Sequence, residues 1–410
     1  GVAGDCRARR RSASHRASRL LREAPCMLAA VPRGVKLTAA AFVAGNALRS
    51  RIRARRASHR STRVKMKAFH DISGISALRP SKSERAAAAE NCLTNPTSGD
   101  KLVIKTLVLV VHGVKSKESK GLSELKAIRV AAESRGITLV ELVTTHEGHC
   151  ETLVRECDVS TVDAFGVMGG DGTLREGVSG MASRPEIEHR PIFAFPCGTG
   201  NNFARDLRLR TIEDCFAAID RGVVHAVDAV KVTHPGGVTY SVNCVTWGMA
   251  RDAAETAEGM RWLGPVRYDV AGFWHILKGK LNFARLAASA DVAKPASAEG
   301  LPHEDYMMMF AQNTRCSGRG FAFTPSAKLD DGMFDLVAVR KCGTFHTVGL
   351  FDAVKAGGAH VEDDAVCYVQ ATSVALATEN ATDLVGIDGE VNVKTPITIE
   401  CCKGQFRTLV

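Results

Sequence analysis

The sequence predicts three parts: a basic, largely disordered N-terminal arm, a doubly wound, Rossmann-like α/β domain, and a mainly β, sandwich-like domain. Three observations support this division. Charge and composition change near residue 100, strands then alternate with helices as far as Gly222, and the apolar pattern afterwards shifts toward a period of two. The predicted boundaries are 1–100, 101–225 and 226–410. A chain of 410 residues has room for these parts, because one domain takes roughly 150 residues.

The basic charge belongs to the arm. Residues 1–100 carry 21 Lys and Arg but six Asp and Glu, whereas the rest of the chain carries 33 basic and 38 acidic residues. Apolar residues of the arm follow no regular period, so we expect no core there and at most a strand-like piece at 64–75. A tail attracted to anionic lipid and a targeting peptide both remain open. Binding to nucleic acid is disfavoured, because no aromatic side chains are interleaved with the basic ones. The chain begins with Gly1, so we expect further residues before it.

Cysteine usage and hydropathy restrict the cellular setting. The 13 cysteines are scattered and form no Cys-x-x-Cys pair, which indicates reduced thiols without a zinc site or a disulfide framework. No apolar run reaches the roughly 18 residues of a membrane span. We therefore expect a cytoplasmic protein that contacts membranes at their surface, unless the arm directs it to an organelle.

The elements of the α/β domain follow from the apolar pattern in chain order. Residues 106–111 form a continuous apolar run, which is typical of a buried parallel strand. Leu122, Leu125, Ile128 and Ala132 recur at helical spacing, and Gly136 can end that helix. Further strands are predicted at 137–143, 164–168 and 191–195, with a helix at 151–156.

The second half reads mainly as strands. Residues 224–232 and 238–247 flank the turn Pro235-Gly236-Gly237, which predicts a hairpin. One helical stretch is predicted at 253–288. Later strands are predicted at 306–312, 333–339, 365–377 and 397–401.

A first glycine cluster, Gly169-Gly170-Asp171-Gly172-Thr173, follows a predicted strand and opens a helix. Glycine lets backbone N–H groups approach a polyphosphate, and a helix N-terminus adds partial positive charge. A carboxylate in such a loop would repel phosphate unless a metal ion or a hydroxyl proton engaged it. Asp171 is therefore a candidate general base or metal-water ligand, with an ordinary glycine-rich turn as the alternative.

Two further motifs accompany the first cluster. Pro196-Cys197-Gly198-Thr199-Gly200-Asn201-Asn202 also follows a predicted strand, so the two loops should lie side by side at one edge of a parallel sheet. Near the C-terminus stands Gly386-Ile387-Asp388-Gly389-Glu390. Its two carboxylates suit metal-water binding or proton abstraction, with a solvated turn as the alternative. A Walker A sequence is absent.

Taken in order, these motifs resemble the catalytic domain shared by diacylglycerol kinases, sphingosine kinases and ceramide kinases. The family's GGDGT stands at 169–173 with Glu176 after it, its PxGTGNxFA at 196–204, and its closing DGE at 388–390. A segment from Asn313 to Gly332 is similar to the family's "N…P.AxLxDGxLDL" stretch. The resemblance spans about 101–410.

The segment 258–269 resembles the sphingosine and ceramide kinase branch. In that branch two arginines reach the nucleotide phosphates, which implies this role for Arg261 and Arg267. The same branch has an acidic residue facing the lipid headgroup where this chain has Asp252. The alternative role for Asp252 is that it caps a helix beginning near Ala253.

The resemblance implies an ATP- and Mg²⁺-dependent lipid kinase that phosphorylates the primary hydroxyl of a sphingoid base, ceramide or diacylglycerol. It assigns Asp171 or Glu390 as the base, Asp388 as a further catalytic carboxylate, and Asp171 and Asp388 as ligands of Mg²⁺ through water. The implied nucleotide-binding residues are Gly169, Gly170, Gly172, Thr173, Thr144, Gly198, Thr199, Gly200, Asn201, Arg261 and Arg267.

Two alternatives remain. A kinase for a soluble substrate, of the NAD kinase or phosphofructokinase type, shares the GGDG loop. A catalytically inactive lipid-binding homologue is suggested by departures from the family pattern. The family's first phosphate loop, usually NPxSG, is His112-Gly113-Val114-Lys115-Ser116 here, and Asn202 replaces a common Asp.

Overall fold

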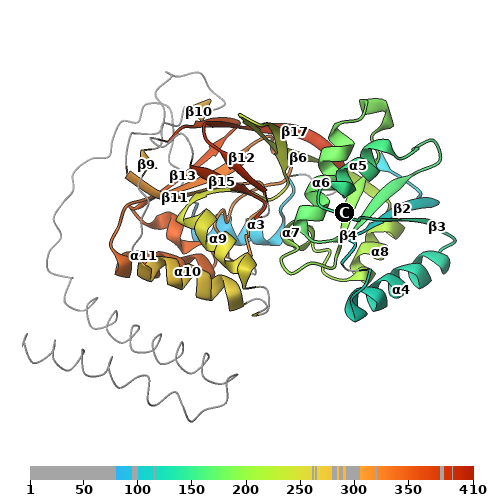
Figure 1. Ribbon diagram of the computed structural model, residues 1–410, viewed down its shortest axis with the longest axis horizontal. Helices are drawn as coiled ribbons and strands as arrows, with labels where there is room; N and C mark the ends of the chain where they lie inside the picture. The colour runs from blue at the N-terminus through green and yellow to red at the C-terminus, as the bar shows by residue number, and fades with distance from the viewer. Residues whose placement is uncertain are drawn as a thin grey trace, which may run out of the picture. The chain divides into compact units, whose positions relative to one another are not determined.

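The structure is a computed structural model, and its described residues all belong to one compact unit, Asp71–Val410 (Figure 1). The described ranges are 80–94, 100–114, 116–260, 263, 266–278, 284–285, 290–291, 305–318, 321–378, 383–389 and 391–410. The expectations for the arm as far as residue 79, including the strand-like piece at 64–75, lie outside these ranges.

The first domain is built on a parallel sheet, as predicted. Its strand order is β3-β2-β4-β5, and every neighbouring pair is parallel. The strands are β2 (Thr106–Val111), β3 (Thr138–Val143), β4 (Ala164–Gly169) and β5 (Ile192–Pro196). The helices are α4 (Ser119–Glu133), α5 (His149–Glu156), α6 (Asp171–Ala182), α7 (Asn202–Asp206) and α8 (Ile212–Arg221), with a 3₁₀ turn η3 (Glu186–Glu188). Gly169 and Pro196 are register partners, so both glycine clusters begin at the same edge of the sheet.

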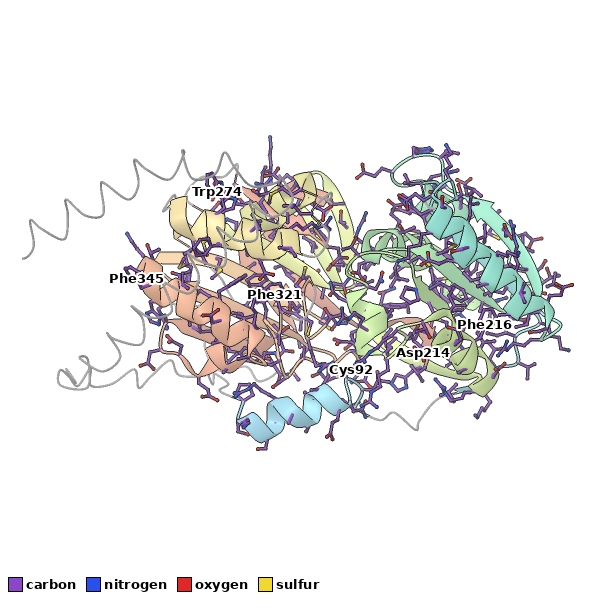
Figure 2. The ribbon with its side chains drawn as sticks, turned by 90° about the horizontal axis from the view of Figure 1, so that it is seen from below. Cys92, Asp214, Phe216, Trp274, Phe321 and Phe345 are labelled. Atoms are coloured by element: carbon purple, nitrogen blue, oxygen red, sulfur yellow. The ribbon has the colours of Figure 1, made fainter. Side chains whose placement is uncertain are left out.

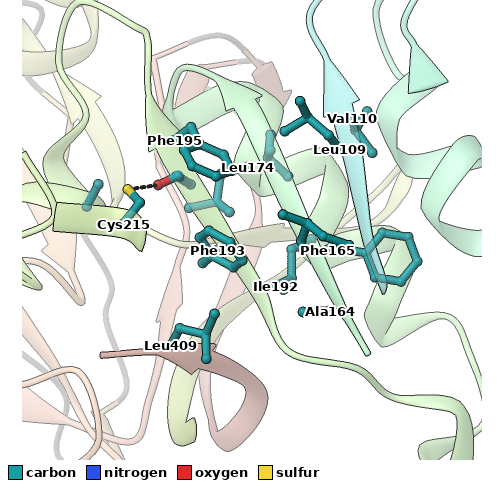
Figure 3. Packing of buried hydrophobic residues seen from close by; sticks show 14 of the residues in the cluster. Leu109, Val110, Ala164, Phe165, Leu174, Ile192, Phe193, Phe195, Cys215 and Leu409 are labelled. Carbon is teal, nitrogen blue, oxygen red and sulfur yellow. Dashed lines mark hydrogen bonds between the residues drawn. The ribbon is translucent and has the colours of Figure 1, made fainter. Parts of the chain in front are cut away.

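The strand residues of this sheet form a core of close-packed aliphatic and aromatic side chains (Figure 3). Phe193 and Phe195 of β5 have ring centroids 5.2 Å apart, and Phe195 also contacts Phe216 of α8 at 5.7 Å. The thiol of Cys215 donates a hydrogen bond to the carbonyl oxygen of Ala194 at 3.5 Å. The continuous apolar run that predicted β2 is explained by this burial, because both faces of the strand are covered.

The second domain contains two antiparallel sheets. One has the order β1-β6-β17-β14-β10 with β7 paired to β6, and the other has the order β13-β12-β11-β8-β15-β16 with β9 paired to β11. The first sheet consists of β1 (Asp100–Lys101), β6 (Val223–His234), β7 (Gly237–Ser241), β10 (Ala290–Asp291), β14 (Ser373–Leu376) and β17 (Ile397–Leu409). The second sheet consists of β8 (Cys244–Gly248), β9 (Ala284–Arg285), β11 (Asp305–Gln312), β12 (Phe334–Arg340), β13 (Val366–Ala371), β15 (Leu384–Ile387) and β16 (Val391–Lys394). One core cluster joins them, with Val230 and Ile399 from the first sheet against Trp247 and Phe334 from the second. The predicted sandwich-like domain is confirmed.

Helices α9 (Met249–Gly259) and α11 (Thr344–Lys355) pack on the second sheet, and α10 (Arg267–Lys278) packs against both of them. A 3₁₀ turn η5 (Ala359–Glu362) follows α11. A separate apolar cluster lies under them and includes Ala250, Phe310, Val337 and Leu350. None of the helices in the described part of the chain is both long and apolar enough to cross a membrane.

Several predicted elements are corrected by the structure. The stretch expected at 253–288 is two helices, α9 and α10, because the sequence Gly264-Pro265 interrupts the helical pattern between them. The strand expected at 238–247 is divided into β7 and β8, which belong to different sheets. The strand expected at 365–377 is likewise divided into β13 and β14. Helix α11 was not predicted.

The C-terminal strand β17 serves both domains. It pairs antiparallel with β6 along most of its length, with a bulge between Cys402 and Phe406. Ile399 lies in the sandwich core, whereas Phe406 and Leu409 lie in the core of the parallel sheet, where Figure 3 shows Leu409 below Phe193. The chain therefore ends on the first domain, and a boundary at residue 225 does not separate the two cores.

Helix α3 (Lys82–Glu90) lies inside the segment that the sequence assigned to the arm. The Ser81 side chain and the Glu84 side chain cap its first turn reciprocally. After the helix, Cys92 and Leu93 enter the core of the parallel sheet, and the Cys92 thiol donates to the carbonyl oxygen of Asp206 at 2.9 Å (Figure 2). The basic composition around this segment hid the contribution of its last residues to the core.

This packing predicts different results for two truncations. A chain that begins at Asp71, the start of the compact unit, serves as the reference, and one that begins at Gly99 should melt lower. The second truncation loses the buried side chain of Leu93, and removing a buried Leu side chain typically costs roughly 3 kcal/mol. Thermal unfolding by circular dichroism compares the two, and Leu93→Ala in the longer chain is the control. Equal melting temperatures for all three would show that the segment contributes nothing to the core.

Candidate active site

The two glycine loops touch backbone to backbone. A Cβ atom at Gly198 would lie 2.5 Å from the Cα of Gly170, and one at Gly169 would lie 2.7 Å from the hydroxyl oxygen of Thr173. Glycine is therefore required at 198 by the close approach of the two loops, and at 169 by the Thr173 side chain of its own loop. The first loop joins β4 to α6, and the second joins β5 to α7.

The N-terminus of α6 faces a cavity that both loops line. Gly170 is the N-cap residue, and no side chain caps this end of the 12-residue helix. The backbone N–H groups of the first turn are thus available to a ligand, and the helix dipole favours an anion there. The expected phosphate cradle formed by Gly169, Gly170, Gly172, Thr173, Gly198, Thr199 and Gly200 lines this cavity.

Asp171 lies at the start of α6 and on the cavity wall. Its carboxylate accepts hydrogen bonds from the backbone N–H of Asn202 at 3.0 Å and of Phe203 at 3.4 Å. Burial raises the pKa of Asp171 to about 6, and the charge of Asp388 acts in the same direction, while the Asn202 N–H partly offsets both. A carboxylate with a raised pKa at the wall of a cavity is suited to accept a proton.

Asp388 is held far more tightly. Its carboxylate accepts hydrogen bonds from the Ser241 hydroxyl at 2.7 Å and from three successive backbone N–H groups, those of Val242, Asn243 and Cys244, at 2.8–3.1 Å. The backbone of Asp388 has a φ of 50°, in the left-handed region. These contacts tie the C-terminal turn to the break between β7 and β8, and they explain why that predicted strand is divided.

The cavity has a polar end and an apolar end. Its volume is about 450 Å³. At the polar end lie the glycine loops, Asp171 and Asp388. Most of the remaining wall comes from the second domain, and its apolar members include Met249, Ala250, Ile276, Met308, Phe310, Phe321, Phe323, Val337, Val339, Leu350, Phe351 and Val354. Phe310 stacks on Phe323 with centroids 3.9 Å apart, and Phe321 contacts Phe351 at 5.1 Å.

A second cavity of about 870 Å³ adjoins the first. The two share wall residues, among them His112, Thr173 and Gly389. Thr144 lines the second cavity, and its hydroxyl oxygen accepts a hydrogen bond from the Gly113 N–H at 3.0 Å. The altered first loop therefore still packs against Thr144, and Lys117 adds a positive charge to the same wall.

The other residues that the sequence singled out are placed as follows. Arg267 lines the first cavity and forms an ion pair with Glu258 at 2.7 Å. Asn201 does not line either cavity, because its amide bonds to Gly198 and Pro196 within its own loop. Arg261 and Glu390 lie outside the described residues.

Asp252 lies on α9 and is absent from the described walls of both cavities. Its carboxylate forms an ion pair with Arg251 at 2.9 Å, and Arg251 also pairs with Glu255. The alternative that Asp252 caps a helix is wrong, because α9 begins at Met249 with Gly248 as its N-cap.

Glu176 anchors the neighbouring loop. Its carboxylate accepts hydrogen bonds from the backbone N–H groups of Gly148 at 2.9 Å and Cys150 at 3.2 Å. It therefore fixes the N-terminus of α5 beside the second cavity, where Glu176 itself is a wall residue.

The sequence analysis missed Asn243, Cys244 and Thr246, which line the first cavity from the loop before β8 and from β8 itself. It also missed the apolar wall as a unit. No local motif marks these residues, because the wall is assembled from segments far apart in the sequence.

The site fits a nucleotide better than it fits a metal ion on its own. The uncapped helix end and the touching loops supply backbone donors for phosphate. Among the described residues, no three His, Cys, Asp or Glu side chains converge to hold a metal ion. Asp388 already accepts four hydrogen bonds, which suits contact with an ion through water rather than direct coordination.

A parallel-sheet domain that carries two glycine loops is thus joined to a β domain that contributes an apolar cavity wall. Comparison with known families identifies it further. The diacylglycerol kinase catalytic domain matches residues 93–232, and the YegS C-terminal NAD kinase beta sandwich-like domain matches residues 243–410. The chain belongs to the lipid kinase family that carries these two domains, which confirms the resemblance found in the motifs.

Individual relatives are distant but match over most of their length. Sphingosine kinase 2 of Arabidopsis thaliana is 25% identical over 342 residues, which cover 72% of this chain and 71% of the relative. A diacylglycerol kinase of Staphylococcus saprophyticus is 28% identical over 310 residues, covering 74% and 88%. The fold matches the crystal structure of a diacylglycerol kinase from Bacillus anthracis str. Sterne with a TM-score of 0.55 at 20% identity, covering 75% of this chain and 98% of that one.

Proposed function

We propose that the protein transfers the γ-phosphoryl group of ATP to the primary hydroxyl of a membrane lipid, namely a sphingoid base, ceramide or diacylglycerol. The observation that carries this proposal is the two-ended cavity, in which Asp171 and the glycine loops meet an apolar and aromatic wall. A soluble, polar acceptor would have no use for such a wall, whereas an acyl or alkyl chain is stabilised by burial there.

The residues of the site have different roles in the proposed reaction. Backbone N–H groups of the glycine loops and of the α6 N-terminus hold the phosphates, and Arg267 adds positive charge; Arg261 is proposed to do the same. Asp171 accepts the hydroxyl proton, and Asp388 positions the C-terminal turn beside it and raises its pKa. Mg²⁺, when bound with ATP, offsets charge on the phosphates, and Asp171 and Asp388 would face it through water.

Contact with the membrane surface is part of the proposal. The side chains of Trp274 on α10 and Phe345 on α11 are 51% and 55% exposed, and both helices line the cavity with other residues (Figure 2). Exposed aromatic side chains are typical of surfaces that meet the lipid–water boundary. The positive charge of the arm would add attraction to anionic lipid.

A substrate panel tests the function. The full chain is incubated with γ-labelled Mg-ATP and detergent-dispersed sphingosine, ceramide or diacylglycerol, with NAD and fructose 6-phosphate as soluble acceptors. We expect label in at least one lipid and in neither soluble acceptor. Labelling of a soluble acceptor alone would overturn the proposal. Absence of ATP binding in a parallel titration would identify the protein as an inactive homologue.

The choice of lipid is addressed by Asp252→Ala. If Asp252 faced the ammonium of a sphingoid base, the variant would lose roughly one to two orders of magnitude on that lipid and less on neutral lipids. The ion pair with Arg251 and the position of Asp252 off the cavity wall favour the other result. We expect small and equal changes in kcat/KM on sphingosine and diacylglycerol. A loss confined to sphingosine would instead place Asp252 at the headgroup.

A further inference from the structure

Asn243 has a fixed backbone at the polar end of the cavity. It lies in the break between β7 and β8, and its N–H donates to the Asp388 carboxylate at 3.1 Å. Its carbonyl oxygen accepts a hydrogen bond from the Asn313 N–H at 3.0 Å. The residue is 1% exposed, and it is part of the cavity wall. The main chain therefore sets where the side-chain amide can reach.

No hydrogen bond of ordinary length and angle joins the buried Nδ2 or Oδ1 of Asn243 to a described residue. Asn243 and Asp171 line the same cavity, and the break that holds Asn243 is tied to Asp388 at its polar end. The Asn243 side chain also acts on Asp171 as a donor and lowers the pKa of that carboxyl group. Leaving a buried amide unsatisfied costs free energy, so such a group is retained where a ligand completes its hydrogen bonds.

Neighbouring groups at the same end of the cavity are already engaged. The Asn202 side chain donates to Asp171 at 3.4 Å, and the Ser317 hydroxyl donates to the Cys244 sulfur at 3.3 Å. Asp171 and Asp388 are acceptors. A hydroxyl group that enters this end and points its proton at Asp171 has a lone pair left to accept a hydrogen bond, and Asn243 is placed to donate it.

We propose that Asn243 is a catalytic residue that orients the acceptor hydroxyl of the lipid, with its Nδ2–H donating to the hydroxyl oxygen while the O–H points at Asp171. In the step that follows, that oxygen forms a bond to the γ-phosphorus as the bond to the β,γ-bridging oxygen breaks. ADP leaves with the electron pair, and Asp171 takes the proton. This assignment rests on the proposed function and adds a residue to it.

The test compares Asn243→Leu with the wild-type chain, since Leu has nearly the same volume but no donor. We expect kcat for lipid phosphorylation to fall about 100-fold, as for loss of one donor at a reacting oxygen. ATP affinity and the slow hydrolysis of ATP by water should stay within about twofold, because neither uses the lipid hydroxyl. The melting temperature should be equal or higher, since an unsatisfied buried amide has been removed.

Asn313→Leu is the matched control. Asn313 is equally buried, but its amide donates to the carbonyl oxygen of Asp228 at 2.9 Å and does not line the cavity. This variant should melt lower and keep its kcat. Should Asn243→Leu fail to fold, Asn243→Ala should show the same separation of lipid transfer from ATP hydrolysis.

The outcomes separate this inference from the proposed function. An unchanged kcat in Asn243→Leu, with a lowered melting temperature, would show that the amide is structural. Equal losses of lipid transfer and ATP hydrolysis would assign it to the nucleotide and overturn the hydroxyl contact. In both cases lipid phosphorylation by the wild-type chain leaves the proposed function standing. A wild-type chain that phosphorylates no lipid would overturn both.

Discussion

Asp171→Asn is expected to lower kcat by roughly 10²–10⁴-fold, the usual contribution of a general base. The amide keeps the shape of the carboxylate, and its oxygen can still accept from the backbone N–H of Asn202, while the longer hydrogen bond from Phe203 to the other oxygen is lost. The loops should therefore stay in place. What is lost is the group that takes the hydroxyl proton. Steady-state kinetics on the best lipid, with circular dichroism to confirm the fold, measure the effect.

Asp214→Asn is the control for this substitution. Asp214 also stands in the first turn of a helix, α8, but its carboxylate accepts from the backbone of Arg210 and Thr211, and it is absent from the described cavity walls (Figure 2). Its loss should affect stability, by about 1 kcal/mol for a capping contact, and leave kcat unchanged. Near-normal turnover in Asp171→Asn would remove Asp171 from the chemistry.

Gly198→Ala is expected to weaken ATP use by roughly 10²-fold, because displacing a positioned group by about 1 Å can cost that much. The added methyl group would stand 2.5 Å from the Cα of Gly170 and 2.7 Å from the Oδ1 of Asn201. The first of these is backbone, which cannot rotate away, so one glycine loop must move. A titration with a fluorescent ATP analogue measures the affinity directly.

Gly349→Ala is the matched control, since nothing lies within 4 Å of the added carbon in helix α11. That variant should bind ATP normally. ATP affinity in Gly198→Ala equal to that of the control would mean that the two loops do not have to touch when the nucleotide binds.

The sequence predicted the residues whose chemistry is concentrated in short motifs. The glycine loops and Asp171 each follow directly after a buried strand, and parallel strands end at one edge of their sheet. The apolar run of β2 and the alternation of strands with helices were sufficient for the first domain. These signals are local, because each of them is contained in a single short segment of the sequence.

The remaining features depend on contacts between distant segments. Asp388 binds backbone groups almost 150 residues earlier, and this contact both divides β7 from β8 and brings Asn243 to the cavity. The apolar wall is formed by residues of α9, α10, β11, β12 and α11. The sequence of any one of these elements does not indicate that a shared wall exists. Helix α3 was hidden in a basic segment because composition averages over the whole arm, whereas the capping box involves Ser81 and Glu84.

The position of strand β17 determines how late during synthesis the first domain can complete its folding. Ribosomes deliver the chain from its N-terminus, so the phosphate loops leave the ribosome long before residues 397–410 do. Until those residues arrive, the parallel-sheet core lacks Phe406 and Leu409, and Val223 lacks the N–H donor that Val410 supplies. The nascent first domain therefore exposes apolar surface until residues 397–410 have left the ribosome, and it can complete its core only then.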